Sequence, residues 1–267
     1  MLRDITLGQY YRTESVIHKL DPRVKIVGTF VFLVAIFIVN NVLGYVVAGL
    51  FLAMNIKLSN VPVKFIFRGM KSIFFLLMIS VVFNLFLTPG EPIFTVWKIK
   101  ITDEGLKIAI KMAIRLVFLI TGSSLMTLTT TPNNLTDGLE SLLNPLKLVH
   151  VPVHEISMMM SIALRFIPIL LEETDKIMKA QMARCADFES GSLINRAKNM
   201  VPLLVPLFIS AFRRAMDLAM AMEARCYRGG EGRTKMKPLV YCSRDRVAYA
   251  VLVLFLIICI VVGRLKF

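Results

Sequence analysis

The tripeptide Ala-Arg-Cys occurs twice in this sequence, at residues 183–185 and at residues 224–226. An arginine guanidinium offers five N–H donors to the carboxylates and carbonyls of a partner, and small flanking residues leave it little shielded. One copy alone would be explained as a cation that favours a helix C-terminus. Two copies, 41 residues apart on similar helices, favour a pair of protein-docking sites. The predicted docking residues are Ala183, Arg184, Cys185, Ala224, Arg225 and Cys226.

Other side chains that could do chemistry are sparse. The four cysteines have no Cys-x-x-Cys spacing and the three histidines form no ligand pattern with them, so we expect no metal and no cofactor. The glycine-rich stretch at residues 229–232 lacks the phosphate-loop pattern and follows a predicted helix instead of a strand. We therefore predict a non-catalytic chain, with any ATP bound by another subunit. Because thiols beside positive charge are the more reactive ones, redox regulation at Cys185 and Cys226 is an alternative role.

The composition indicates a membrane protein. Hydrophobic residues make up 56% of the 267 residues, whereas soluble domains are about 45–50% apolar. A formal net charge of +14 accompanies this apolarity. A nucleic-acid-binding protein of that charge would show a soluble core and a recognisable module, and the sequence has neither. We expect this chain to lie in a lipid bilayer and to bind no nucleic acid.

Apolar segments predict five membrane-spanning helices, since a span needs roughly 20 predominantly apolar residues. Residues 24–56 are too long for one span and predict a helical hairpin with its turn at Asn40-Asn41. The other predicted spans are residues 72–87, 106–127 and 247–262. Between the third and fourth spans we expect a loop, residues 89–106, with Trp97 near the membrane interface.

Two further apolar stretches, residues 156–171 and 200–212, are shorter than a span and continue into charged amphipathic segments. That pattern favours long cytosolic helices that lie under the membrane, with two additional spans as the alternative. The sequence thus predicts an all-α membrane protein with about five transmembrane helices and long cytosolic amphipathic coupling helices. The expected domains are the N-terminal tail with four spans, the cytosolic helices, and the last span: residues 1–131, 132–245 and 246–267.

Lysine and arginine are distributed unevenly about these spans. The N-terminal tail carries five, the connector at residues 57–71 carries four, and residues 132–246 carry sixteen. The opposite side carries six, four between residues 98 and 111 and two at the C-terminal end. Because cytoplasmic loops carry the excess of positive charge, we expect a multi-pass protein of the cell membrane with a cytosolic N-terminus.

Ionisable residues are scarce within the predicted spans. Arg115 is the main one, and helix pairing or snorkelling is the simpler explanation for it. A substrate or proton path would need more polar residues at membrane depth, so a stand-alone membrane permease or channel is the weaker alternative. A membrane enzyme, the third class, would need a catalytic group of residues that we do not find near the interface.

Three segments resemble the transmembrane T component of energy-coupling factor (ECF) vitamin transporters, the EcfT/CbiQ family. Ala180–Gly191 and Ala219–Gly232 resemble its two signature segments, and His18–Lys25 resembles its N-terminal motif. The resemblance covers essentially the whole chain. It implies that two ABC-type ATPases each bind one X-Arg-X motif of the coupling helices, and that a membrane-embedded S component binds the vitamin. Arg184 and Arg225 would then dock the ATPases, whose motion reaches the S component through this chain.

This chain departs from that family in one respect, because cysteine stands where glycine usually follows the arginine, at Cys185 and Cys226. Cysteine is small, so we expect docking to survive. It is less free than glycine to adopt a left-handed backbone conformation, so we expect these helix endings to differ from those of the family.

Methionine is abundant, with 16 residues, and gathers on the predicted cytosolic helices. Methionine usually fills gaps in a core, but methionine-rich surfaces also repack against differing partners. Such a surface would suit a subunit that serves several S components. We therefore expect part of this group to face the S component, with Met158, Met159 and Met160 as the candidate contacts.

Overall fold

A computed structural model describes residues 10–66, 74–87, 92–96, 99–186, 188, 193–230 and 236–264. Contacts within the chain divide it into two compact units. We call residues 8–141 with 239–267 the bundle unit and residues 142–238 the helix-pair unit. The domain boundaries expected at residues 131 and 245 describe passage between membrane and cytosol, so they stay a prediction.

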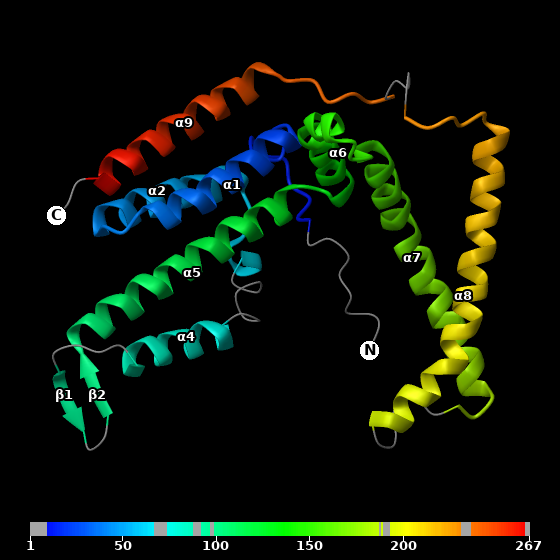
Figure 1. The fold of residues 1–267 in the computed structure, drawn as a ribbon, viewed down its shortest axis with the longest axis horizontal. Helices are drawn as coiled ribbons and strands as arrows, with labels where there is room; N and C mark the ends of the chain where they lie inside the picture. Colours follow the sequence, from blue (N-terminus) through cyan, green and yellow to red (C-terminus); the bar gives the residue numbers. More distant parts are fainter. Residues whose placement is uncertain are drawn as a thin grey trace. The chain divides into compact units, whose positions relative to one another are not determined.

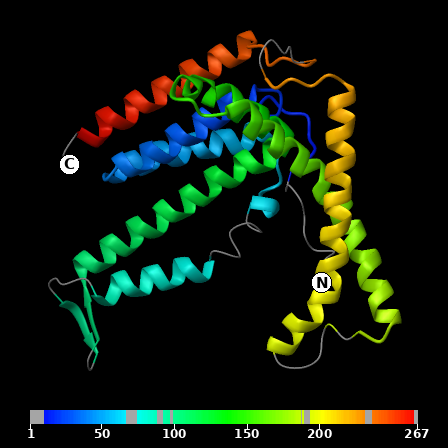
Figure 2. The ribbon, with the colours of Figure 1, turned by 45° about the vertical axis from the view of Figure 1, so that its right-hand side comes forward.

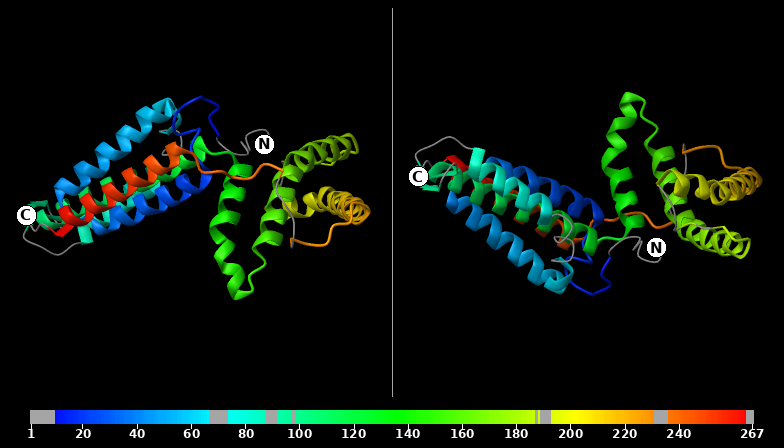
Figure 3. Two further views of the ribbon diagram at one scale, coloured as in Figure 1. Left: turned by 90° about the horizontal axis from the view of Figure 1, so that it is seen from above. Right: turned by 90° about the horizontal axis from the view of Figure 1, so that it is seen from below.

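In the described residues, the bundle unit is built around five helices: α1 (Pro22–Ile38), α2 (Val42–Ser59), α4 (Phe74–Leu87), α5 (Asp103–Thr129) and α9 (Ser243–Arg264). Both α1 and α2 pack against α5 and against α9, and α4 packs against α5 (Figure 1, Figure 3). After α5 the chain turns at once into α6 (Pro132–Leu143). Gly138 of α6 packs closely on the start of α1, since a Cβ there would lie 3.0 Å from Pro22 Cβ.

Local sequence explains the boundaries of the first two helices. Asp21 begins α1 by accepting the backbone N–H of Arg23 at 2.8 Å, and Pro22 stands at the first helical position, where a missing N–H costs nothing. The turn predicted at Asn40-Asn41 separates α1 from α2. This turn requires Gly44, because a Cβ there would lie 2.3 Å from Val39 Cγ1.

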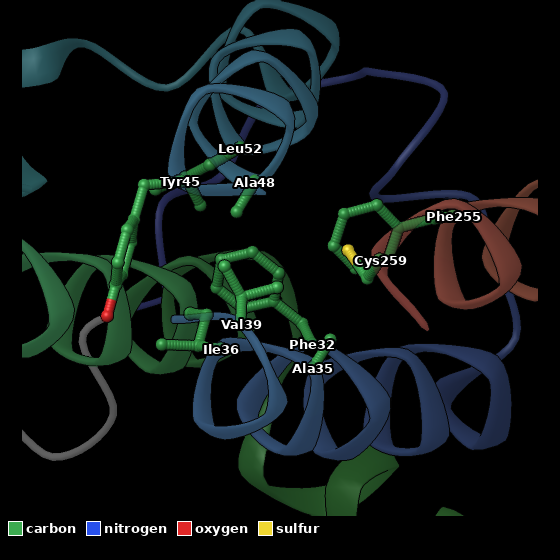
Figure 4. Packing of buried hydrophobic residues seen from close by; sticks show 9 residues of the cluster. All are labelled: Phe32, Ala35, Ile36, Val39, Tyr45, Ala48, Leu52, Phe255 and Cys259. Carbon is green, nitrogen blue, oxygen red and sulfur yellow. The ribbon is translucent and has the colours of Figure 1, made fainter. Parts of the chain in front are cut away.

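The core of the bundle unit lies where α1, α2 and α9 meet (Figure 4). The rings of Phe51 and Phe255 stack with their centroids 4.1 Å apart. Small residues at Ala35 and Ala48 let the helices approach closely, as is common between membrane helices. The buried cluster consists of Phe32, Ala35, Ile36, Val39, Tyr45, Ala48, Leu52, Phe255 and Cys259.

Among the described residues, four helices are long and apolar enough to cross a membrane: α2, α5, α9 and α7 (Val153–Ala183). With 17 residues α1 falls slightly short of a span, and α4 has 14. The chain is an all-α membrane protein, as predicted, although four helices meet these criteria where about five spans were expected. Since α7 is one of the four, the cytosolic placement of residues 156–171 and its alternative both stay predictions.

The segment between α4 and α5 contains a short antiparallel hairpin, in which β1 (Pro92–Val96) pairs with β2 (Ile99–Thr102). The sequence interpretation as a plain loop missed it. The α5 helix also begins three residues before its predicted start, since Asp103 and Glu104 are favourable in a first helical turn. Trp97, expected at the membrane interface, lies outside the described residues.

Arg115 joins two helices of the bundle unit. Its guanidinium donates from α5 to the Val39 carbonyl at 3.3 Å and to Asn40 Oδ1 at 3.2 Å, both just beyond the end of α1. Carbonyls at a helix C-terminus lack donors within the helix, so the arginine satisfies one of them. The helix-pairing interpretation of this residue is confirmed.

The helix-pair unit consists mainly of two long helices, α7 with 31 residues and α8 (Leu193–Ala224) with 32. A short 3-10 helix, η2 (Asn144–Val149), precedes α7. The two long helices pack against each other (Figure 2). Each copy of the Ala-Arg-Cys tripeptide stands at the C-terminal end of one of them.

Candidate functional site

The first tripeptide ends α7 in a defined hydrogen-bonding pattern. Ala183 is the last helical residue and Arg184 is the C-cap. The N–H of Cys185 donates to the Met182 carbonyl at 3.0 Å, and the N–H of Ala186 donates to the Gln181 carbonyl at 3.0 Å. This pair of bonds is the Schellman motif, which satisfies two carbonyls that the helix leaves without donors.

The second tripeptide ends α8 in the same way. The N–H of Cys226 donates to the Glu223 carbonyl at 2.9 Å, and the N–H of Tyr227 donates to the Met222 carbonyl at 3.1 Å. Both cysteines adopt the left-handed conformation, with φ of 67° at Cys185 and 56° at Cys226. Cysteine thus adopts the left-handed turn that glycine adopts most freely, and the expected difference from the helix endings of the family stays a prediction. The paired hydrogen bonds offset the cost that a side chain bears in this conformation.

All six predicted docking residues are exposed. Neither Arg184 nor Arg225 forms an ion pair with another residue that the structure describes. Each guanidinium thus stands at a helix tip with its donors directed at no described carboxylate, between an alanine and a cysteine. The arrangement offers two similar cationic tips to a partner.

Replacing Cys185 or Cys226 with glycine should stabilise the protein, because glycine adopts the left-handed conformation without the penalty of a Cβ. We expect up to about 1 kcal/mol for each site, part of it offset by the greater freedom of glycine in the unfolded chain. Thermal denaturation of the purified protein measures the effect. Cys242→Gly is the matched control, since it replaces another exposed cysteine at a position without positive φ. An equal or larger gain in the control would contradict the explanation.

Two contacts fix the relative direction of α7 and α8. Arg214 of α8 forms an ion pair with Glu173 of α7, with Nη2 and Oε2 2.9 Å apart. Further along α7, Gln181 donates from Nε2 to the carbonyl of Pro202, which lies earlier in α8, at 3.3 Å. A step forward along α7 therefore matches a step backward along α8, so the helices run antiparallel.

The two arginine tips consequently lie at opposite ends of the helix pair (Figure 2). Arg184 comes 11 residues after Glu173, and Arg225 comes 11 residues after Arg214. With a rise of 1.5 Å per residue, each tip is roughly 16 Å from the ion pair and the two tips are about 33 Å apart along the helices. That separation suits two different binding grooves better than one.

Proline shapes the contact near the first tip. Pro206 has no N–H, so the carbonyl of Pro202, four residues earlier, lacks its usual helical donor. The side-chain amide of Gln181 takes that place from across the helix pair. The carbonyl that Pro206 leaves without a donor in α8 thereby accepts a hydrogen bond from the last turns of α7.

The segment after the second tip packs on the start of α7. A Cβ at Gly230 would lie 2.5 Å from His154 Cδ2 and 2.8 Å from Cγ, so only glycine allows the imidazole to lie against the backbone there. The glycine-rich stretch that lacks a phosphate-loop pattern thus has a packing role at Gly230.

Apolar side chains are exposed along the helix pair. One i, i+4 row of α8 is exposed over its whole length, reaching 70% at Phe212, whereas Leu203 is buried. Its members are Met200, Leu204, Phe208, Phe212, Met216 and Met220. On α7, Met159 and Met160 are exposed and Met158 is half-buried. The nine methionines of these helices therefore fill no buried core in the described part of the chain: Met158, Met159, Met160, Met178, Met182, Met200, Met216, Met220 and Met222.

The N-terminal segment His18–Lys25 takes part in a polar cluster of the bundle unit. Asp21 and Arg23 form an ion pair at 2.8 Å, and the Arg23 guanidinium lies 3.7 Å from the centre of the Tyr241 ring. Lys25 donates from α1 to the carbonyls of His18 and Thr129 at 3.2 and 2.9 Å. These bonds join the start of α1 to the end of α5 and to the segment before α9.

Asp245 completes this cluster, and the sequence interpretation missed it. The carboxylate is only 2% exposed and accepts the N–H of Asp21 at 2.9 Å and the N–H of Cys242 at 2.7 Å. A signal existed, since Asp245 is an acid in the first turn of α9, where a carboxylate is well placed to accept backbone N–H groups. Its partner 224 residues away in the sequence could not have been inferred from spacing.

The charges and the burial of this cluster shift the pKa values of its side chains. Burial would raise the pKa of the Asp21 carboxyl, but hydrogen bonds from Arg23 and the nearby charges of Arg23 and Lys25 outweigh burial and lower the pKa. The hydrogen bond to Asp21 raises the pKa of Arg23 further. Burial, with the nearby Lys25 charge, lowers the pKa of His18. The Asp21–Arg23 pair thus stays charged at neutral pH.

Known proteins match nearly the whole chain. Residues 13–236 match the model of the cobalt transport protein family. The chain is 54% identical over 256 residues to the energy-coupling factor transporter transmembrane protein EcfT of Ruminiclostridium cellulolyticum, covering 96% of both chains. It is 57% identical over 251 residues to the EcfT protein of Clostridium kluyveri, covering 93% of both. With the EcfT protein of Bacillus subtilis it shares 49% over 246 residues, 92% of this chain and 93% of that one.

Proposed function

The chain belongs to the family of energy-coupling factor transporter transmembrane proteins, and on that basis we propose that it couples two ABC-type ATPases to a membrane-embedded S component. Each ATPase binds one arginine tip, Arg184 with Ala183 and Cys185, or Arg225 with Ala224 and Cys226. ATP hydrolysis takes place in the ATPases. The S component selects the vitamin or other micronutrient that is imported.

One observation carries this proposal. Two exposed arginines end two antiparallel helices with identical hydrogen-bond patterns, with about 33 Å of helix length between them. Two equal partners need two equal docking points that both can occupy at once, and this geometry supplies them. A stand-alone permease or channel would have no use for such a pair, and the membrane arginine Arg115 is engaged in joining helices.

The orientation of the chain is part of the proposal. The bonds of Lys25 to Thr129 and of Asp21 to Asp245 bring the starts of α1 and α9 to the same end of the bundle as the end of α5. That end carries Arg23, Lys25, Arg244 and Arg246, whereas acids occupy the first turn of α5 at the other end. By the positive-inside rule the cationic end and the N-terminus face the cytosol.

Labelling of native thiols tests the docking proposal. Cys185 and Cys226 lie beside the arginines, while Cys242 is an exposed cysteine that belongs to the bundle unit. In the complex with both ATPases, maleimide labelling of Cys185 and Cys226 should slow by about tenfold or more, because interface residues are shielded from solvent. Mass spectrometry of the labelled peptides gives the three rates separately. The labelling rate of Cys242 should not change. Equal rates at Cys185 and Cys226 with and without the ATPases would exclude docking at the tips.

We place the S component on the exposed apolar residues of the helix pair, with Met158, Met159 and Met160 among its contacts. Exposed apolar rows of this length mark surfaces that a protein partner or lipid covers, and a membrane-embedded S component would cover this one. Methionine adapts to partners of different shape, which suits a subunit shared between several S components.

Replacing Met158, Met159 and Met160 together by leucine should reduce transport unequally with two different S components. Leucine keeps the apolar area but loses the flexible thioether that adapts to each partner. Uptake assays of the assembled transporter measure the effect. Three exposed methionines of the bundle unit, Met54, Met78 and Met112, replaced by leucine form the control set. Equal losses with both S components, or none, would show that these methionines do not select partners.

A further inference from the structure

A cavity of about 270 Å³ opens at the cationic end of the bundle unit. Its walls come from the first turns of α1 and α9, the last turns of α2 and α5, and the segment before α1. The volume is roughly nine times the ~30 Å³ that a water molecule occupies in the liquid, so it accommodates a substantial part of an acyl chain.

Most of the cavity wall is apolar, with aromatic and aliphatic side chains such as Phe32, Phe51 and Leu252. Two wall positions are glycines that cannot carry a larger residue without displacing these side chains. A Cβ at Gly122 would lie 2.6 Å from the Phe32 ring, and one at Gly28 would lie 3.1 Å from Leu252. The shape of the cavity between the four helices therefore depends on glycine at positions 28 and 122.

The charged residues of the wall are both cations, Lys25 and Arg244. Lys25 Nζ donates to the carbonyls of His18 and Thr129, which leaves one of its three donors for a ligand. Within the described part of the bundle unit, no carboxylate lines the cavity. The acids nearby, Asp21 and Asp245, are engaged by Arg23 and by backbone N–H groups.

The other polar side chains of the wall bond to their own helices. The hydroxyls of Thr29 and Thr129 donate to the carbonyls four residues earlier, and the amide of Asn55 donates to the Phe51 carbonyl. The cavity thus combines an apolar interior with two cationic groups. This is the chemistry of a site for an amphiphile with an anionic head.

We propose that this cavity holds one acyl chain of an anionic phospholipid, with the phosphate of its headgroup at Lys25 and Arg244. Basic pockets between transmembrane helices bind anionic headgroups, and charge-assisted hydrogen bonds from lysine and arginine suit phosphate oxygens. Arg244 lines the cavity and is exposed, so it can reach a lipid headgroup while the acyl chain lies inside the cavity. The proposal goes beyond the coupling function and does not depend on it.

Lipid retention by the full-length chain tests this site. The protein is reconstituted into phosphatidylcholine vesicles that contain a minor fraction of phosphatidylglycerol, then extracted, and its bound lipids are quantified by native mass spectrometry. Wild-type protein should retain phosphatidylglycerol in excess over its share of the vesicle lipids. One cation near a membrane surface contributes about 1 kcal/mol, so Arg244→Glu should reduce that excess about fivefold or more.

Arg246→Glu is the matched control, because Arg246 is exposed two residues further along the same helix and does not line the cavity. It should leave the excess unchanged. A third variant, Ala248→Phe, fills apolar space in the wall and should lower retention of phosphatidylglycerol without changing any charge. Comparable melting temperatures establish that the variants fold.

Three outcomes would overturn the proposal. Equal loss in Arg244→Glu and Arg246→Glu would assign the effect to general surface charge. Equal retention of both lipids would mean that a neutral lipid occupies the cavity. The third outcome is that neither lipid is retained. If Ala248→Phe also loses the S component in a separate co-purification, a side chain of that partner fills the cavity. None of these results bears on the arginine tips, since the assay contains no ATPase.

Discussion

Reversal of both tip charges, Arg184→Glu with Arg225→Glu, should remove the ATPases from the purified complex and reduce uptake to background. A buried arginine is often among the residues that dominate an interface, and a glutamate in its place adds a charge that the ATPase groove is not built to accept. We expect the amount of co-purified ATPase to fall by about tenfold or more. Each single reversal should remove about half of the ATPase, because in the proposed complex each tip binds one subunit.

The matched control for this experiment reverses two other cations of the same helices, Lys176→Glu with Arg213→Glu. Both residues are exposed, and they lie 8 and 12 residues before the tips. This double variant has the same net charge as the first, so it separates a general loss of positive charge from a loss at the tips. Full ATPase content and uptake in the tip variant would refute the docking proposal. Equal losses in both double variants would refute its specificity.

Replacement of Asp245 by alanine should strongly destabilise the bundle unit. The carboxylate accepts two backbone N–H groups, those of Asp21 and Cys242, in a position that is 2% exposed. Leaving buried donors without acceptors costs about 1–3 kcal/mol each, so we expect a loss of about 3 kcal/mol and a fall in melting temperature of about 5–10 °C.

Asp245→Asn should fall between wild type and Asp245→Ala, because the amide keeps one acceptor oxygen and loses the other. Asp217→Ala is the control, since Asp217 is exposed on α8. Thermal denaturation of the detergent-purified protein, followed by size-exclusion chromatography, ranks the four proteins. A melting temperature for Asp245→Ala within 1 °C of wild type, a tolerance of roughly a third of a kcal/mol, would show that the two N–H groups find other acceptors.

The sequence predicted well what depends on local pattern. The helical hairpin with its turn at Asn40-Asn41 follows from the length of an apolar run and from turn residues, and the structure confirms it. The sequence also predicts that the two tripeptides end helices, because glycine follows each of them within a few residues. In both cases the information lies within a few turns of the residues concerned.

Features that depend on packing between distant segments could not be predicted from the sequence. The bond between Asp21 and Asp245 joins residues 224 positions apart, and no periodicity encodes it. The antiparallel register of α7 and α8 is seen in contacts such as the Glu173–Arg214 ion pair, whose partners are ordinary charged residues in the sequence. The left-handed conformation of the two cysteines was also not predictable from residue type. Glycine adopts this conformation more readily than cysteine, but two backbone hydrogen bonds at each helix end stabilise it here.

The position of the Glu173–Arg214 ion pair has a mechanical consequence. It stands 11 residues from each arginine tip, so the helix pair is a lever with two equal arms of roughly 16 Å. A rotation of about 10° between the arms displaces each tip by roughly 3 Å. Equal arms give neither end a mechanical advantage, so force applied at one tip is balanced by equal force at the other. In the proposed complex, the two ATPases would therefore carry equal loads.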